Sequence, residues 1–189
     1  MTDSGDSPGT YRVSDGSAVP FNDALRQWAL VAHDVLVDTA SKRNEFITYK
    51  DLAEQVQALS GIRTRSQMRN WIGRGVLGRV AERCHAAGEP PLTALCVRKD
   101  QTVGDGYRYV LELAGLPIPE DLEMHAAYAR RECYRRYAPD FSDPHGEPAL
   151  PPRVEAARRA AAKAQPSPPA LCADCYTQLP SNGICDYCG

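Results

Sequence analysis

The sequence contains no long apolar run. No segment approaches the roughly 20 consecutive apolar residues that a membrane-spanning helix needs, so no such helix is expected. The N-terminal stretch "MTDSGDSPGT" lacks the basic start and the apolar segment of a signal peptide. We therefore expect a cytoplasmic protein, in which thiols stay reduced. Its seven cysteines are then better explained as core residues or metal ligands than as disulfides.

A large net charge is also missing, although charge is unevenly distributed along the chain. The net charge of −2 excludes a polycation. The first 23 residues contain four aspartates and one arginine, whereas residues 61–83 contain six arginines and one glutamate. With 43% hydrophobic and 24% charged residues, the chain can form one core of moderate size with appendages.

Composition divides the chain into four parts. Residues 1–20 are rich in Ser, Gly, Asp and Pro and cannot bury enough apolar surface to offset ordering, which predicts a disordered tail. Residues 21–137 have the apolar periodicity of one folded domain. Prolines surround "RVEAARRAAAKA" in residues 138–170, which predicts a linker carrying a short, exposed helix. Residues 171–189 hold four of the seven cysteines and form a separate small module.

Two predicted helices open the domain. Apolar residues such as Trp28 and Leu36 recur on one face of the first helix, and His33 is expected on its solvated side. The sequence "TYKD" at residues 48–51 has the shape of a capping box, with Asp in place of the commoner Glu. It predicts the start of a second helix, which Gly61 ends.

The remaining elements predict a winged helix-turn-helix. The stretch "VLGRVAERCHAAG" predicts a third helix that stops at Gly88, and "PIPEDLEMHAAYARRECYRRY" predicts a fourth. Between them, "LTALCVRKD" and "YRYVLEL" read as strands around the glycine-bearing turn "QTVGDG", which predicts a β-hairpin. The expected fold is therefore mostly α with a β-hairpin wing, followed by a small zinc ribbon.

The basic segment 61–83 surrounds the predicted third helix and is the candidate DNA-binding surface. Arginine anchors phosphates or reads guanine, and Asn and Gln read adenine, most readily from the N-terminal part of a recognition helix. The alternative is that this charged face is only solvated. The candidate DNA-contacting residues in this segment are Arg63, Arg65, Ser66, Gln67, Arg69, Asn70, Arg74 and Arg79.

The neighbouring pair Cys84 and His85 suggests a nucleophile with its base. Helical spacing places Cys84 on the buried stripe of its helix and turns His85 about 100° away from it. Cys96 alternates with apolar residues on a predicted strand and is expected to be buried as well. A buried thiol has a raised pKa, so we expect structural roles for both cysteines.

The pairs Cys172-x2-Cys175 and Cys185-x2-Cys188 are separated by nine residues. This spacing supplies four thiolates to one tetrahedral ion and predicts a structural zinc site holding one Zn²⁺. Such a short module has no core of its own, so metal binding would supply its folding free energy. No lysine or arginine lies near these cysteines, so we expect contact with a protein partner or self-association at least as much as contact with DNA.

The stretch "ITYKDLAEQV", a basic helix, two prolines, a strand and "GDGY" together resemble the DNA-binding domain of the alkylguanine-DNA alkyltransferases and alkyltransferase-like proteins. That domain is a winged helix-turn-helix that binds the minor groove and flips out a base. The resemblance implies that Tyr49 contacts a DNA phosphate, with Lys50 beside it on the backbone. The reactive Pro-Cys-His-Arg of the family is absent here, which argues against alkyl transfer.

These patterns lead to three hypotheses of different classes. The first is a non-enzymatic protein that binds duplex DNA, in transcriptional regulation or recognition of modified or damaged DNA, with the zinc ribbon contacting a partner. The second is a diverged alkyl-transfer or repair enzyme that uses Cys84 or Cys96. The third is a zinc-ribbon adaptor without DNA binding. No small-molecule substrate is evident from the sequence.

Overall fold

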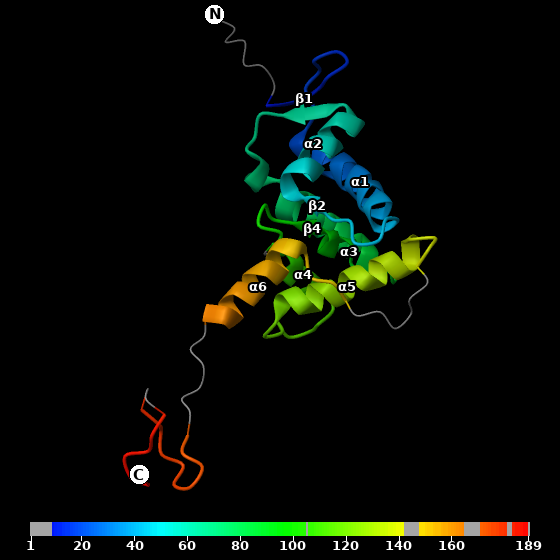
Figure 1. Ribbon diagram of the computed structural model, residues 1–189. Helices are drawn as coiled ribbons and strands as arrows, with labels where there is room; N and C mark the ends of the chain where they lie inside the picture. Colours follow the sequence, from blue (N-terminus) through cyan, green and yellow to red (C-terminus); the bar gives the residue numbers. More distant parts are fainter. Residues whose placement is uncertain (1–8, 105, 142–147, 165–170, 181–182, 189) are drawn as a thin grey trace, which may run out of the picture. The chain divides into compact units, whose positions relative to one another are not determined.

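The computed structural model describes residues 9–104, 106–141, 148–164, 171–180 and 183–188. The chain divides into two compact units, Met1–Val154 and Glu155–Gly189. It is mostly helical, as predicted, with two small two-stranded sheets (Figure 1). The elements are β1 (Thr10–Arg12), α1 (Phe21–Ala40), β2 (Ile47–Thr48), α2 (Tyr49–Ser60), β3 (Ile62–Thr64), the 3₁₀ turn η1 (Met68–Asn70), the π-helical turn η2 (Ile72–Leu77), α3 (Gly78–Ala87), the 3₁₀ turn η3 (Leu92–Leu95), β4 (Cys96–Val97), α4 (Gly106–Leu113), α5 (Leu122–Tyr137) and α6 (Pro152–Ala164).

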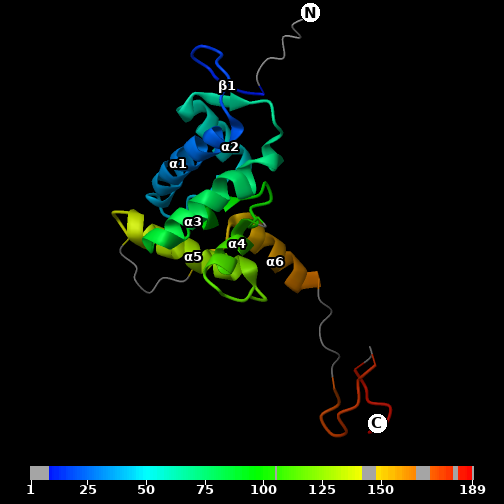
Figure 2. The same ribbon diagram turned by 180° about the vertical axis from the view of Figure 1, so that it is seen from behind.

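Helix α1 supplies much of the core of the first unit. It contacts α2, α3 and α5, and both views of the ribbon show it beside α2 (Figures 1 and 2). Trp28 and Leu36 are fully buried on its inner face, as the periodicity predicts. The Trp28 ring lies against Trp71, with ring centroids 4.6 Å apart, and its Nε1 donates to the carbonyl of Ile62 at 3.1 Å. These contacts join α1 to the segment that leads into η2.

Helix α2 begins and ends where the sequence predicts. The Thr48 hydroxyl accepts the Asp51 backbone N–H at 3.1 Å and donates to the Asp51 carboxylate at 2.7 Å. Gly61 ends the helix in the left-handed conformation, with φ of 66°. That conformation suits glycine because it has no Cβ to clash with the backbone.

The prediction of a disordered tail over residues 1–20 is wrong for residues 9–20. Strand β1 pairs antiparallel with β3, so that Thr10 lies opposite Thr64. The carbonyl of Gly9 accepts the N–H of Arg65 at 2.8 Å, and Val19 is buried. Composition could not reveal this pairing, because the partner strand lies more than 50 residues away in sequence. The prediction for residues 1–8 lies outside the described residues.

The predicted hairpin wing is also wrong. Residues 92–97 form η3 and the short strand β4, which pairs parallel with β2, so that Ile47 lies opposite Cys96. Residues 107–113, predicted as the second strand, lie in helix α4. Tyr107 and Leu111 are both buried, which matches a helical period of four as well as an alternation of two. A single bridge between Val97 and Val103 stands where the hairpin was expected, and the winged-helix fold is not confirmed.

The predicted exposure of His33 is wrong. This residue was expected on the solvated side of its helix, but its relative exposure is 6%. The side chain is buried because Glu89, which follows α3, lies against it, with His33 Nε2 3.0 Å from Glu89 Oε2. The helical periodicity could not predict this burial, because Glu89 lies far from His33 in sequence.

In the described part of the predicted linker 138–170 there is one helix, α6, where a helix was expected. Its first residues belong to the first unit: the N–H of Arg153 donates to Gln101 Oε1 at 2.9 Å, and Val154 is buried. Residues 142–147 and 165–170 of this segment lie outside the described residues. Across the described residues, no helix has the length and apolar character required to cross a membrane.

Candidate nucleic-acid interface and metal centre

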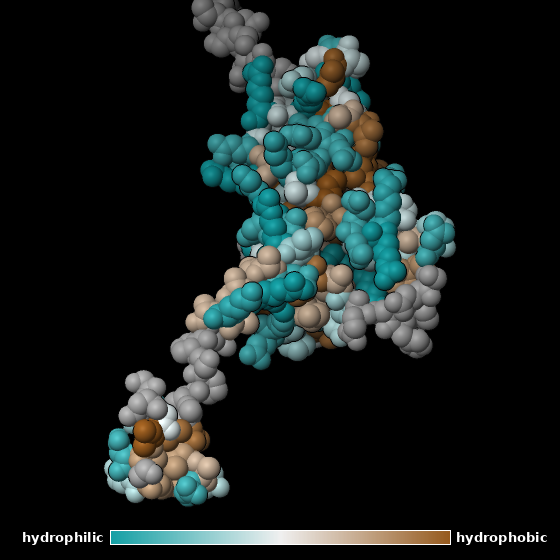
Figure 3. All heavy atoms as spheres, viewed as in Figure 1, coloured by the Kyte–Doolittle hydropathy of each residue, from teal (hydrophilic) through white to brown (hydrophobic). Residues whose placement is uncertain are grey.

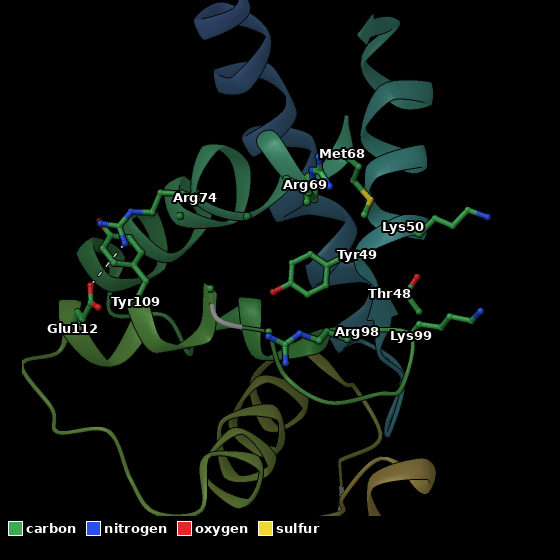
Figure 4. A pocket seen from close by; sticks show the side chains of 15 residues that line it. Thr48, Tyr49, Lys50, Met68, Arg69, Arg74, Arg98, Lys99, Tyr109 and Glu112 are labelled. Carbon is green, nitrogen blue, oxygen red and sulfur yellow. Dashed lines mark ion pairs between the residues drawn. The ribbon is translucent and has the colours of Figure 1, made fainter. Parts of the chain in front are cut away.

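A cavity of about 820 Å³ opens in the first unit beside Tyr49. Its walls come from the start of α2, the η1 and η2 turns, the loop after β4, and α4. We call it the Tyr49 pocket, and Figure 4 shows the Tyr49 ring near its centre. Its lining residues are Thr48, Tyr49, Lys50, Met68, Arg69, Ile72, Gly73, Arg74, Gly78, Arg98, Lys99, Gly104, Gly106, Tyr109 and Glu112.

The position of the Tyr49 ring depends on the glycines of "GDG". A Cβ placed on Gly104 would lie 2.0 Å from Tyr49 Oη, and one on Gly106 would lie 3.5 Å away. Glycine at position 104 therefore leaves the space that the Tyr49 ring occupies, and any residue with a side chain there would fill it. The sequence predicted a turn at this motif. In the structure, the glycines of the motif also leave space for the aromatic ring of Tyr49 from α2.

Positive charge dominates the rim of the pocket. Lys50 and Lys99 are exposed and extend away from the Tyr49 ring, and Arg98 lies on the other side of the ring from Arg69 (Figure 4). Among the described residues, Glu112 is the one acidic side chain of the lining. The five basic lining residues are Lys50, Arg69, Arg74, Arg98 and Lys99. Such a surface attracts a polyanion.

Arg74 is held at one end of the pocket by groups of α4. Its guanidinium lies 3.6 Å from the centroid of the Tyr109 ring, and its Nη1 is 3.8 Å from the Glu112 carboxylate. The Tyr109 hydroxyl donates to Glu82 at 2.5 Å, and this hydrogen bond raises the tyrosine pKa. The guanidinium is therefore held by stacking on Tyr109 and by the Glu112 carboxylate.

Four of the predicted DNA-contacting residues, Tyr49, Lys50, Arg69 and Arg74, meet at this pocket. Three other predicted arginines lie outside its lining. Arg63 is exposed on β3 and Arg65 is exposed just after it, so neither belongs to a recognition helix. Arg79 lies on α3, where its Nη2 donates to the Asn22 side chain at 2.7 Å.

The three polar residues predicted to read bases also lie outside the pocket lining. Ser66 is half-buried in the connector after β3, and its carbonyl accepts Trp71 Nε1 at 3.4 Å. Gln67 and Asn70 are exposed at the two ends of η1. These side chains therefore precede α3 and do not project from its first turn.

Sequence reasoning missed Arg98 and Lys99 as pocket residues. They fall in the stretch expected to be the end of a wing strand. In the structure they follow β4 directly, and the parallel pairing of β4 with β2 brings them next to the start of α2. The adjacent basic pair was visible in the sequence, but its neighbour across the sheet was not.

The two cysteines considered as nucleophiles are buried. Cys84 and Cys96 each have a relative exposure of 1%, whereas His85 is exposed. Burial raises the pKa of the Cys84 thiol to about 11 and also raises that of Cys96. Both thiols are therefore protonated near neutral pH, as the predicted structural roles require.

The four cysteines of the second unit come together. The sulfur atoms of Cys172, Cys175, Cys185 and Cys188 all lie within 4.8 Å of one another. We call them the four-cysteine cluster. Two backbone hydrogen bonds stabilise this arrangement. The N–H of Cys172 donates to the carbonyl of Thr177, and the N–H of Tyr187 donates to Cys185 Sγ at 3.4 Å. The cluster could hold one metal ion.

Two cysteines of the cluster are placed to carry negative charge. The Tyr187 backbone N–H and the Thr177 hydroxyl lower the pKa of Cys185 to about 6. The Thr177 side chain, 2.9 Å from Cys175 Sγ, also lowers the pKa of Cys175. Thiolates are the form in which cysteine binds metals, so these donors suit a cation site.

The resemblance to the alkyltransferase-like proteins rests on short motifs, of which Tyr49 and the "GDGY" glycines meet at one pocket. No protein-family model, no curated protein and no solved structure matches the chain.

Proposed function

We propose that this protein binds duplex DNA without catalysing a reaction, and that the Tyr49 pocket is the contact surface. The observation that carries the proposal is that five basic side chains from four segments of the chain line one pocket together with the Tyr49 ring. Lysine and arginine neutralise phosphates, and an aromatic ring can stack on a base. The proposal includes the cytoplasmic setting expected from the sequence.

Recognition of a modified or damaged base is the form of DNA binding that the pocket favours. A cavity of about 820 Å³ has room for an extruded nucleotide. Regulation by reading an intact groove would favour side chains on the first turn of a helix, and Ser66, Gln67 and Asn70 lie before that turn. Transcriptional regulation remains the other form of the hypothesis.

A salt series tests DNA binding. The affinity for a mixed-sequence duplex is measured across a range of salt concentrations, together with the double variant Lys50→Ala/Lys99→Ala. We expect the wild-type affinity to fall with salt. In the variant, the slope of log K against log salt should lessen by about 0.9 for each phosphate that the missing side chains no longer neutralise.

The control variant is Lys42→Ala/Arg135→Ala, which removes the same charge from exposed side chains outside the pocket. It should keep the wild-type slope. An affinity that does not respond to salt would favour the third hypothesis, an adaptor without DNA binding. Equal losses of affinity in the two double variants would show that only net charge matters and that the pocket has no special role.

We also propose that the four-cysteine cluster holds one structural Zn²⁺. Four thiolates at this spacing form the closed tetrahedral set typical of structural zinc. Metal analysis of the full chain should show that Cys172→Ser/Cys175→Ser loses one equivalent of zinc relative to wild type. An unchanged zinc content in this variant would contradict the assignment.

A protein contact is the role that the surface of the cluster suits. Figure 3 shows hydrophobic side chains at the surface of this segment, and Ile184, Tyr176 and Tyr187 are exposed by 60%, 75% and 84%. No basic residue occurs from residue 171 onward, which disfavours phosphate contact. The partner would be another protein or a second copy of this chain.

The second hypothesis, an alkyl-transfer enzyme using Cys84 or Cys96, is disfavoured by the burial of both thiols. It predicts that one of them loses reactivity stoichiometrically when the protein meets alkylated DNA. Unchanged thiol reactivity in that experiment would remove the hypothesis.

A further inference from the structure

Three potential metal ligands meet in the first unit, away from the four-cysteine cluster. They are His33 of α1, Cys84 of α3 and Glu89, which follows α3. Their ligand atoms lie within 4.8 Å of one another, and His33 Nε2 is 3.0 Å from Glu89 Oε2. Imidazole, thiolate and carboxylate are the three side-chain types that zinc prefers.

The surroundings of His33 favour coordination through Nε2. Its other ring nitrogen, Nδ1, lies 3.4 Å from the carboxylate of Asp34. A carboxylate beside one nitrogen of a metal-binding histidine fixes the ring and its tautomer, and directs the other nitrogen at the metal. The side chains of His33 and Asp34 are 8% and 81% exposed, so the ring is buried while its orienting partner is solvated.

Charge balance also suits a divalent cation. The Glu89 carboxylate lies against the His33 ring and offers an anionic oxygen ligand. Cys84 is protonated in the metal-free protein and would release its proton to solvent on binding the ion, so that thiolate and carboxylate together neutralise a 2+ charge. A neutral set is the arrangement that a site with 1% and 6% exposed ligands can accommodate at least cost.

The site borders a cavity that opens to the surface. Cys84 and Glu89 help to line a cavity of about 470 Å³, whose other walls are largely apolar side chains of α4 and α5 such as Val110 and Ala129. Three protein ligands leave one position of a tetrahedral ion for water or a small ligand, which distinguishes this set from a closed four-cysteine site.

We propose that His33, Cys84 and Glu89 form a second metal site, which binds one divalent transition-metal ion of the zinc type. It joins α1 to the end of α3. The sequence pair Cys84 and His85 suggested chemistry with the wrong histidine, because the histidine that faces Cys84 comes from α1.

Metal stoichiometry of the full chain tests this site separately from the four-cysteine cluster. Each protein is loaded with Zn²⁺, freed of loosely bound metal and analysed for metal content. We expect two equivalents in the wild type and one in Cys172→Ser/Cys175→Ser. Adding Glu89→Gln or Cys84→Ser to that variant should remove the remaining equivalent. Two different substitutions are used so that a folding defect in one, checked by circular dichroism, leaves the other informative.

Cobalt provides a spectroscopic readout. In the Cys172→Ser/Cys175→Ser background, bound Co²⁺ should give a thiolate-to-cobalt charge-transfer band that is absent when Cys84 is replaced by Ser. The matched control is Cys133→Ala, which removes another buried thiol and should keep both the band and the metal.

The outcomes for the two sites are distinguishable. If Cys172→Ser/Cys175→Ser binds no metal and shows no cobalt band, the second site does not exist and the contact between His33 and Glu89 is only a hydrogen bond. If that variant keeps the wild-type metal content, the four-cysteine assignment is wrong. The second site is then tested by Glu89→Gln alone: loss of metal supports it, and retention of metal contradicts it.

Discussion

At the scale of single residues, the Tyr49 pocket is defined by a side chain that is missing. Gly104 is buried, and the space that its Cβ would occupy is filled by the end of the Tyr49 ring. Any larger residue at position 104 must displace this ring, since tyrosine can move only by changing its rotamer. The aromatic centre of the candidate site therefore depends on a glycine from another element.

Gly104→Ala should therefore weaken DNA binding about as much as Tyr49→Ala does. Tyr49 can swing outward, so we expect only a modest loss of unfolding free energy, about 1 kcal/mol. Duplex affinity and urea unfolding measure the two effects. The control is Gly106→Ala, whose Cβ would lie at an ordinary 3.5 Å from Tyr49 Oη and should leave the affinity unchanged. Wild-type affinity in Gly104→Ala would mean that the ring position is irrelevant to binding.

The cysteines fall into two classes with different reactivity. Cys84, Cys96 and Cys133 are buried, and burial raises the pKa of each thiol. Chelation of metal should unfold the second unit and expose its four cysteines, including Cys172, which is buried in the folded unit, so a thiol reagent at neutral pH should modify these four of the seven cysteines rapidly. The other three should react only when the protein unfolds. Rapid modification of five or more in the folded protein would contradict the burial of these three thiols.

At the scale of elements, local signals predicted some boundaries and long-range pairing decided the rest. The capping box at Thr48 and the terminal Gly61 act within a few residues, so the limits of α2 could be read from the sequence. The strand β1 and the parallel pairing of β2 with β4 depend on partners that no local pattern identifies. The stretch "YRYVLEL" fits both periods, and its packing against α3 selects the helix.

The residues of the candidate site were likewise predictable where a local signal marks them and unpredictable where long-range pairing places them. Tyr49, Lys50, Arg69 and Arg74 were found because charge and motif mark them in the sequence. The separation of Arg63 and Arg65 from this pocket was not predicted, because these two residues lie on and just after β3, whose pairing with β1 is not visible in any local pattern. The proximity of the four cysteines was predicted, since C-x2-C spacing brings the two sulfurs of each pair together.

The cap of α2 gives a prediction at this scale. Thr48→Ala removes the hydroxyl that accepts the Asp51 N–H, and should lower the free energy of unfolding by about 1 kcal/mol. Thr48→Ser keeps the acceptor and should stay close to the wild type. Urea unfolding of the three proteins measures the difference, and equal stability of the Ala and Ser variants would show that the cap contributes nothing.

At the scale of the whole molecule, the chain consists of two units with different sources of stability. The Met1–Val154 unit has a core of tryptophan, leucine and valine side chains. In Glu155–Gly189, Cys172 is the one buried hydrophobic residue among those described, so its fold depends on the four-cysteine cluster. Cys172→Ser/Cys175→Ser should therefore leave the urea midpoint of the first unit unchanged. A large shift in that midpoint would show that the first unit depends on the cluster.

The buried hydroxyls of the first unit predict how its stability responds to alkali. Burial raises the pKa of Tyr107 and Tyr134 above the ordinary value of 10.0. Below about pH 10 both are protonated in the folded and the unfolded chain, so their contribution to stability is fully present. As the pH rises further, the unfolded chain loses these protons first, and the free energy of unfolding falls by about 1.4 kcal/mol per pH unit for each group.

Replacement of one hydroxyl should make this loss shallower. Tyr107→Phe gives up the interaction between Tyr107 Oη and His125 Nδ1, 3.0 Å apart, which costs about 1 kcal/mol near neutral pH. Above about pH 10 its stability should decline less steeply than that of the wild type, because one titrating group is gone. Tyr128→Phe, at a residue that is 50% exposed, should follow the wild-type curve. Urea unfolding at a series of alkaline pH values compares the three slopes, and parallel curves for Tyr107→Phe and the wild type would place the origin of the alkaline loss elsewhere.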